Sequence, residues 1–551
     1  MNLIKNIFIL ILVTLSFQVV TAQPGGGGLE AGEVEVIKEF DARLLDTEKL
    51  KVLPGLPPLD TTSRRLNYEV PLKSVLIDYP DPTLRPIAIK KSKIDKGFRG
   101  FLKAGYGYPN SPYGEFGYNF GGERKNYNLG IHLLHNSANF NNDFKDQRYS
   151  LTDALLKGAY YLEEGGMAVG GKIGYKVDQV HYFGYDPAGG ILGDTLLDRE
   201  QIKQQFNTLG FGVNLFNGER NDLDISYNAG VDFYTMKDNF ASDELGFNLN
   251  LSGTKWFNEK NPLTLTVRTD FTTYEDSIKQ KLNNFYLQPN FTFHGDKFRI
   301  KLGVNLVSFD DNFDLLPDLE ASYALLGARL ALFGGWKGDY VKNSMEKLSD
   351  YNPYISTFGK LDLRNTVYNQ YYGGVRGSIG IIEYNGQIGY KNAKDLALFQ
   401  TDTSDLRRRF ITVYDTVDIF NIEGVITARP FKNFELTGAV TQNIYSPKNQ
   451  AKAWHLPNLN VNITATYLTL EDKLRLKAEL YIENGVPFLD ENGTADNLNG
   501  LFDLSFGADY QLAKNFGIFL NLNNVAGNKR QRWANYPTYG INVLGGVTAR
   551  F

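Results

Sequence analysis

A glycine-rich stretch at residues 166–172 has the spacing of a phosphate-binding loop. Gly166 and Gly171 are followed by Lys172, and a lysine at that position can contact a phosphate. The next residue is Ile173, however, where magnesium coordination needs a Ser or Thr hydroxyl. The surrounding pattern also indicates a turn that leads into a strand, whereas a phosphate-binding loop joins a strand to a helix. Nucleotide binding is therefore not expected.

Two further patterns resemble metal sites. His132 and His135 are three residues apart, which on a strand places them on opposite faces, so they cannot chelate one ion. Asp310, Asn312 and Asp314 place oxygen ligands at alternate positions, but this run lacks the glycine and the glutamate that complete an EF-hand. A loose calcium site there stays open as the alternative to a solvated loop, and no metal site is predicted.

Catalytic and redox chemistry find no support in the chain. It contains no Cys, which excludes disulfides, zinc–thiolate sites and thiol nucleophiles. No Ser/His/Asp set is placed by the sequence, and the carboxylates are too numerous to single out a catalytic pair. The formal net charge is only −4, so no basic surface for nucleic acid is indicated. We expect a protein that is not an enzyme and that binds neither a cofactor nor nucleic acid.

The elements that carry these residues are long strands. In residues 298–306 every second side chain is apolar, while Arg299, Lys301 and Asn305 lie between them. Successive side chains of a strand point to opposite faces, so Leu302 should face lipid and Asn305 a polar interior. The strands of a soluble β-sandwich usually run for five or six residues and are shorter than this alternation. The same alternation recurs in residues 223–233, 245–251, 263–271, 459–467, 474–482, 502–512 and 518–522.

Short polar turns recur at intervals of roughly forty residues, which is the length of two strands with one longer loop. They fall at residues 121–125, 163–166, 217–222, 258–262, 294–297, near 327, near 379, 430–433, 471–473 and 513–515. With a first strand at 99–108 and a last at 540–551, they predict an all-β fold, a transmembrane antiparallel β-barrel of about 22 strands. Longer loops are predicted at the other end of the strands, at residues 185–199, 337–360, 392–409, 445–455, 484–499 and 525–539.

The beginning of the chain and its composition indicate where this barrel lies. In residues 1–22, Lys5 precedes an apolar run, and Val20 and Ala22 suit signal peptidase, so this segment is predicted to be a signal peptide. Aromatic residues make up 13% of the chain and 55 residues are Gly, as aromatic girdles and tight turns require. We therefore expect a barrel in the outer membrane of a bacterial cell, in contact with its lipid.

The last predicted strand ends on an aromatic residue, Phe551. A terminal aromatic resembles the signal that barrel-assembly machinery recognises, so Phe551 is the predicted assembly signal and that machinery an expected partner. The stretches 504–510, 521–525, 533–537 and 540–551 resemble the last three strands of a TonB-dependent receptor. This resemblance implies a 22-stranded barrel that transports bulky ligands past a plug.

Residues 23–98 differ from that family, whose members carry a globular plug ahead of the barrel. This segment holds eight of the 20 Pro of the chain and a run of four Gly, which disfavour helix and central strand. We predict an extended periplasmic arm. Val34, Val36 and Phe40 alternate in a short candidate strand, and they are the candidates for docking a periplasmic or TonB-like partner by strand addition. A linker strand without a partner is the alternative.

The sequence thus predicts a signal peptide at 1–22, the arm at 23–98 and an outer-membrane β-barrel at 99–551. The favoured function is that of a transport channel or receptor resembling the barrel of TonB-dependent receptors. A lumen of about 22 strands is too wide for its own side chains to fill, so the arm or a partner is expected to occlude it. The alternative is a structural scaffold barrel of an envelope complex.

Overall fold

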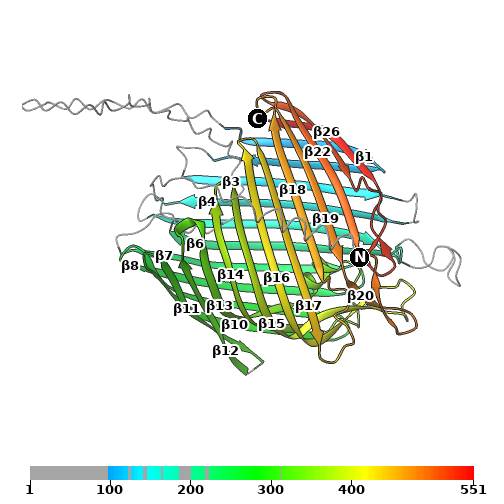
Figure 1. Ribbon diagram of the computed structural model, residues 1–551. Helices are drawn as coiled ribbons and strands as arrows, with labels where there is room; N and C mark the ends of the chain where they lie inside the picture. The colour runs from blue at the N-terminus through cyan, green and yellow to red at the C-terminus, as the bar shows by residue number, and fades with distance from the viewer. Residues whose placement is uncertain are drawn as a thin grey trace, which may run out of the picture. The chain divides into compact units, whose positions relative to one another are not determined.

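Strands that alternate between apolar and polar side chains form one continuous wall, which closes into a barrel (Figure 1). The computed structural model describes residues 97–121, 126–140, 146–162, 166–184, 200–217, 223–310 and 312–551. The barrel unit comprises residues 98–551. The predicted signal peptide and residues 23–96 of the predicted arm lie outside the described residues.

The strands of the wall follow one another around the barrel in chain order. They are β1 (Gly100–Tyr108), β2 (Ser111–Asn119), β3 (Tyr127–Asn139), β4 (Arg148–Tyr161), β5 (Met167–His181), β6 (Lys203–Asn217), β7 (Ile225–Asp238), β8 (Asp243–Phe257), β9 (Asn261–Glu275), β10 (Lys279–His294), β11 (Phe298–Phe309), β12 (Asn312–Ala324), β13 (Ala331–Asn343), β14 (Arg364–Ile379), β15 (Ile382–Thr401), β16 (Phe410–Phe431), β17 (Phe434–Pro447), β18 (Leu459–Thr469), β19 (Leu474–Asn484), β22 (Leu501–Ala513), β23 (Phe516–Asn523) and β26 (Asn542–Arg550).

Every pairing in this wall is antiparallel. After β19 the wall continues through β22, β23 and β26, and β26 pairs with β1 from Phe101↔Arg550 to Tyr108↔Val543. The backbone groups of the first and last strands therefore bind each other, and the described wall closes on itself. The predicted all-β class and the predicted strand count, 22, are both confirmed.

The remaining described elements are short and lie in the connections. They are the 3-10 turn η1 (Gly327–Arg329), the helix α2 (Met345–Tyr351), the hairpin of β20 (Val486–Leu489) with β21 (Ala495–Leu498), and the hairpin of β24 (Gln531–Trp533) with β25 (Tyr536–Pro537). Within the described ranges, no helix has the length and apolar character needed to cross a membrane.

Short turns gather at one end of the barrel and longer loops at the other. The ten predicted turns fall between strands at the end where β1 begins and β26 ends, which we call the turn end; those predicted at 121–125, 163–166 and 217–222 lie mostly outside the described residues. At the opposite end, the loop end, three predicted loops start later than expected, because β13 extends to Asn343, β15 to Thr401 and β17 to Pro447; the loop predicted at 185–199 lies outside the described residues. At the loop end of β15 the alternation of apolar and polar side chains is lost, because both faces of the strand are covered. Leu398 and Phe399 are adjacent in β15, and both are buried.

The two faces of the strands are those expected from the alternation. Leu302 lies on the outer face and is 57% exposed, whereas Asn305 lies on the lumen face and is only 4% exposed. Asn305 is covered because β13 stops pairing with β12 after Lys337 and passes inside the wall. Its side-chain amide donates to the carbonyl oxygen of Gly338 at 2.7 Å.

Aromatic side chains surround the turn end of the wall. The ring centroids of Tyr118 and Phe551 are 5.9 Å apart, and those of Phe293 and Phe298 are 5.7 Å apart. Aromatic rings at this level are typical of the aromatic girdle at a membrane interface. The barrel is therefore an outer-membrane barrel, in which the turn end faces the periplasm and the loop end faces the cell exterior.

Candidate functional site: the closed loop end of the lumen

The loops pack into the mouth of the barrel and form an apolar core of their own. We call this assembly the cap, and define it as α2, residues 352–363, 402–409 and 448–458, and the hairpins β20–β21 and β24–β25. Its core joins loop residues to residues at the ends of wall strands, and comprises Tyr182, Phe183, Ile202, Phe206, Met236, Tyr274, Leu282, Met345, Leu348, Ile355, Leu361, Leu363, Ala397, Phe399, Phe410, Val486, Leu498, Trp533, Ala534 and Tyr536.

This core spans the mouth from one side to the other. Phe206 on β6 and Phe410 on β16 belong to the same cluster, although ten positions separate their strands in the ring of 22. Strands that far apart lie on nearly opposite sides of the barrel. A continuous apolar core between them means that the cap crosses the lumen at its loop end.

The hairpin β24–β25 lies at the centre of the cap. The Trp533 ring centroid is 5.4 Å from those of Phe399 and Phe410, which belong to β15 and β16. Three residues further along, Tyr536 stacks on Tyr354 at 3.9 Å and contacts Phe183 at 5.1 Å. Aromatic pairs of this kind contribute roughly 0.5–1.5 kcal/mol each beyond their buried area, so this hairpin holds the cap together.

His455 joins two segments of the cap to the wall strand β15 through its imidazole ring. The Nδ1 atom lies 2.7 Å from the carbonyl oxygen of Phe399, and Nε2 accepts a hydrogen bond of 3.3 Å from the backbone N–H of Ala534. Because Nε2 accepts, the proton of the neutral ring is on Nδ1. Burial lowers the pKa of His455 from 6.5 to about 4; the bond to Phe399 opposes this change, and the positive charge of Arg532 adds to it.

The helix α2 is attached to the wall by charged groups at both of its ends. The Glu244 carboxylate on β8 accepts hydrogen bonds from the backbone N–H groups of Met345 at 2.5 Å and Glu346 at 3.2 Å. An anion is favourable there because the N-terminus of a helix carries unpaired N–H groups. At the other end, Lys176 on β5 forms an ion pair of 2.8 Å with Asp350. The cap is therefore bound to the wall on the β5–β8 side.

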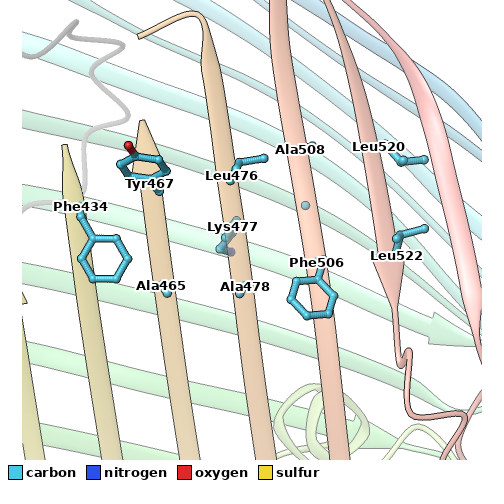
Figure 2. A pocket seen from close by; sticks show the side chains of 11 residues that line it. Phe434, Ala465, Tyr467, Leu476, Lys477, Ala478, Phe506, Ala508, Leu520 and Leu522 are labelled. Atoms are coloured by element: carbon cyan, nitrogen blue, oxygen red, sulfur yellow. The ribbon is translucent and has the colours of Figure 1, made fainter. Parts of the chain in front are cut away.

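A separate hollow lies on the lipid-facing side of the wall between β17 and β23 (Figure 2). Its floor is formed by the small side chains of Ala465, Ala478 and Ala508, and Phe506 stands at its edge. Lys477 lies on the opposite side of the strand, towards the lumen. Apart from the hydroxyl group of Tyr467, this hollow thus offers mainly contacts to hydrocarbon chains.

The residues singled out in the sequence are distributed over the barrel and do not form one site. Val34, Val36 and Phe40 lie outside the described residues, so docking through them stays a prediction. His132 lies 3.1 Å from Glu115, whereas His135 lies 2.9 Å from Thr152 on the other face. The histidine pair is therefore split, as predicted.

The glycine-rich stretch stands where its context indicated, because β5 begins at Met167, directly after a turn. The acidic run is not the loop that was expected: Asp310 directly follows β11, whereas Asn312 and Asp314 belong to β12, and Asp314 accepts a hydrogen bond from the Tyr340 hydroxyl. In the part of the chain that the structure describes, no group of three or more His, Cys, Asp or Glu side chains could hold a metal ion.

Phe551 stands at the seam where the barrel closes. Its carbonyl oxygen accepts hydrogen bonds of 2.8 Å from the N–H groups of Arg99 and Gly100, and its ring stacks against Tyr118. We propose that it also acts as the assembly signal. Phe551→Asp should lower the yield of folded barrel at least several-fold, whereas Arg550→Asp should lower it much less, since only the first change removes the terminal aromatic.

Heat-modifiable migration of outer-membrane fractions on gels measures this yield. The backbone bonds of the seam remain in both variants, so a difference reports on the side chain. Equal yields from the two variants would count against an assembly signal at Phe551.

Sequence reasoning did not find the cap. His455, Trp533 and Tyr536 fall in or next to predicted loops, where polar residues are the rule, and all three are buried. Large aromatic side chains in connections of a membrane barrel were the available signal, because such residues in a loop need a packed environment.

Comparison with known proteins identifies the fold. No family model matches the chain, and no curated protein matches it. Among solved structures, the FrpB iron transporter of Neisseria meningitidis is similar over 83% of this chain and 82% of its own, with a TM-score of 0.63 and 11% identity.

Two further solved structures are similar to this chain over the same share of its length. The pyoverdine receptor FpvA of Pseudomonas aeruginosa PAO1, bound to pyoverdine, has a TM-score of 0.61 and 11% identity over 83% of this chain and 79% of its own. The copper transporter OprC has a TM-score of 0.59 and 12% identity over 83% and 80%. The structural neighbours are TonB-dependent receptors, so the chain shares the 22-stranded barrel fold of that class; no plug lies within the described residues.

Proposed function

We propose that this barrel is an outer-membrane transport channel or receptor whose mouth is closed by its own loops and opened through a partner bound to the N-terminal arm. The single observation that carries the proposal is the cap, which spans a lumen wide enough for a bulky ligand. A scaffold needs no wide lumen, whereas a transporter needs one that opens only on demand. The barrel fold shared with iron and copper transporters supports the same function.

Under this proposal the role of the arm is to bind a partner, and not to occlude the lumen. The cap occludes the loop end with residues of the barrel itself, so occlusion of that end does not require the arm. Val34, Val36 and Phe40 are proposed as its docking residues, because strand addition takes specificity from alternate side chains. Force transmitted through the arm would then loosen the contacts of the cap.

A single cysteine can report whether the cap opens. The chain has no Cys, and Ala534 is 2% exposed at the centre of the cap, so Ala534→Cys places one small hidden thiol there. In living cells we expect a membrane-impermeant maleimide to label it slowly, and labelling to fall at least five-fold when Val34, Val36 and Phe40 are all changed to Asp. Mass spectrometry of the purified protein measures the labelled fraction.

Asn492→Cys, in the exposed turn of β20–β21, is the matched control and should be labelled equally with both arms. Labelling of Ala534→Cys that does not depend on the arm would contradict opening through the arm.

The alternative function is a scaffold barrel of an envelope complex, and the extent of the cap core is the observation that favours it. A core of twenty buried side chains is costly to open. A scaffold predicts that Ala534→Cys stays unlabelled under all growth conditions, while partners still co-purify through an intact arm. The same reporter therefore separates the two functions.

A further inference from the structure

A polar chamber lies in the lumen directly below α2. Its volume is about 530 Å³, and charged side chains from β5, β7, β9, β13 and α2 line it. Most of these charges already have partners. Lys172 forms an ion pair of 2.7 Å with Asp232, and Lys342 contacts Asp270 and Thr272.

Arg268 is different, because its guanidinium has no acceptor among the described residues. It lies over the ring of Tyr286, with 4.0 Å from its central carbon to the ring centroid. This stacking holds the guanidinium plane without using its N–H donors. The Nε atom is buried and makes no hydrogen bond. A buried donor without an acceptor is costly, so water or a ligand must satisfy it.

A second unpaired group lies beside it. Asn250 is the direct cross-strand neighbour of Arg268, and its side-chain oxygen is also buried without a hydrogen bond. On the cap side of the chamber, Lys347 of α2 is exposed and forms no ion pair within the described ranges. Two cations without an ion-pair partner, Arg268 and Lys347, thus line one cavity, and Asn250 lies next to Arg268 on the neighbouring strand.

We propose that this chamber is a binding site for a small molecule that carries a carboxylate or a phosphate group. The planar fork of Arg268, held by Tyr286, would bind the anionic group in two places, as guanidinium groups do with both anions. Lys347 would contact the same ligand from the cap, so that ligand binding in the chamber changes the contacts of α2. This inference deepens the proposed transport function, for which it supplies the class of cargo.

Isothermal titration calorimetry of the detergent-folded full chain tests the site. Inorganic phosphate and citrate are titrated in separate experiments at constant ionic strength. At least one should bind saturably, and Arg268→Gln should weaken that binding roughly 10–100-fold, the effect of losing a charge-assisted hydrogen bond. Binding of citrate alone indicates a carboxylate ligand, and binding of phosphate alone a phosphate ligand.

Arg376→Gln is the matched control. Arg376 also faces the lumen and lies over an aromatic ring, that of Phe333 at 5.2 Å, but it does not line the chamber. The Arg376→Gln variant should bind the anion with the same affinity as the unchanged protein. Should Arg268→Gln fail to fold, Lys347→Gln replaces it.

Absence of saturable binding of both anions, or equal weakening by Arg376→Gln, would overturn the site. Such a failure leaves the labelling of Ala534→Cys untouched, so it is distinguishable from failure of the proposed transport function.

Discussion

Replacing Trp533 and Tyr536 together by alanine should convert the closed barrel into a wide pore. Each side chain is nearly fully buried at the centre of the cap, with exposures of 5% and 2%. Truncation of a buried aromatic side chain costs about 3–5 kcal/mol. Because about 1.4 kcal/mol changes an equilibrium tenfold, the fraction of barrels with an open cap should rise by two or more orders of magnitude. Conductance of the purified protein in planar bilayers measures this change.

A matched control removes two rings from the lipid face. Phe247 and Phe271 stack across β8 and β9 with their centroids 6.3 Å apart, on the outside of the wall. The double alanine variant at these positions loses a similar aromatic contact but leaves the cap intact, so its conductance should stay at the level of the unchanged protein. If the cap variant also stays closed, the lumen is occluded by something other than the cap.

Acidification should loosen the cap through His455. Above pH 6.5 the ring is neutral in both the closed and the open cap, so the full stabilisation is present. Between pH 6.5 and about 4 only the exposed ring of the open cap takes up a proton, because burial lowers the pKa of His455 in the closed cap to about 4. The closed state therefore loses stability as the pH falls through this range, by about 3 kcal/mol in total.

The rate at which a maleimide labels purified Ala534→Cys measures this loss, after correction for the pH dependence of the reagent with Asn492→Cys. His455→Gln is the informative variant, since an amide can donate to Phe399 and accept from Ala534 but does not titrate in this range. We expect its corrected labelling rate to be flat between pH 6.5 and 4. A profile that persists unchanged in His455→Gln would assign the pH dependence to other groups.

The amino-acid sequence by itself determined the wall of the barrel. Alternation in segments such as residues 298–306 reflects contacts of each residue with lipid on one side and the lumen on the other, and this requirement is local. Turn residues are local as well, which is why ten turns and hence 22 strands could be predicted. The alternation also predicted which side chains face lipid and which face the lumen, and Leu302 lies towards lipid as expected.

Only the tertiary structure decided what closes the lumen. The contacts of the cap join residues that are far apart in the chain, such as Glu244 with Met345, His455 with Phe399, and Tyr536 with Phe183. Loop residues carry no periodicity, so their partners cannot be inferred from spacing. Asn305 shows the same limit inside the wall, where its polar type was correctly placed on the lumen face but its burial depends on β13 leaving its neighbour. A closed ring brings the loops of distant strands to one mouth, and there their aromatic side chains find each other.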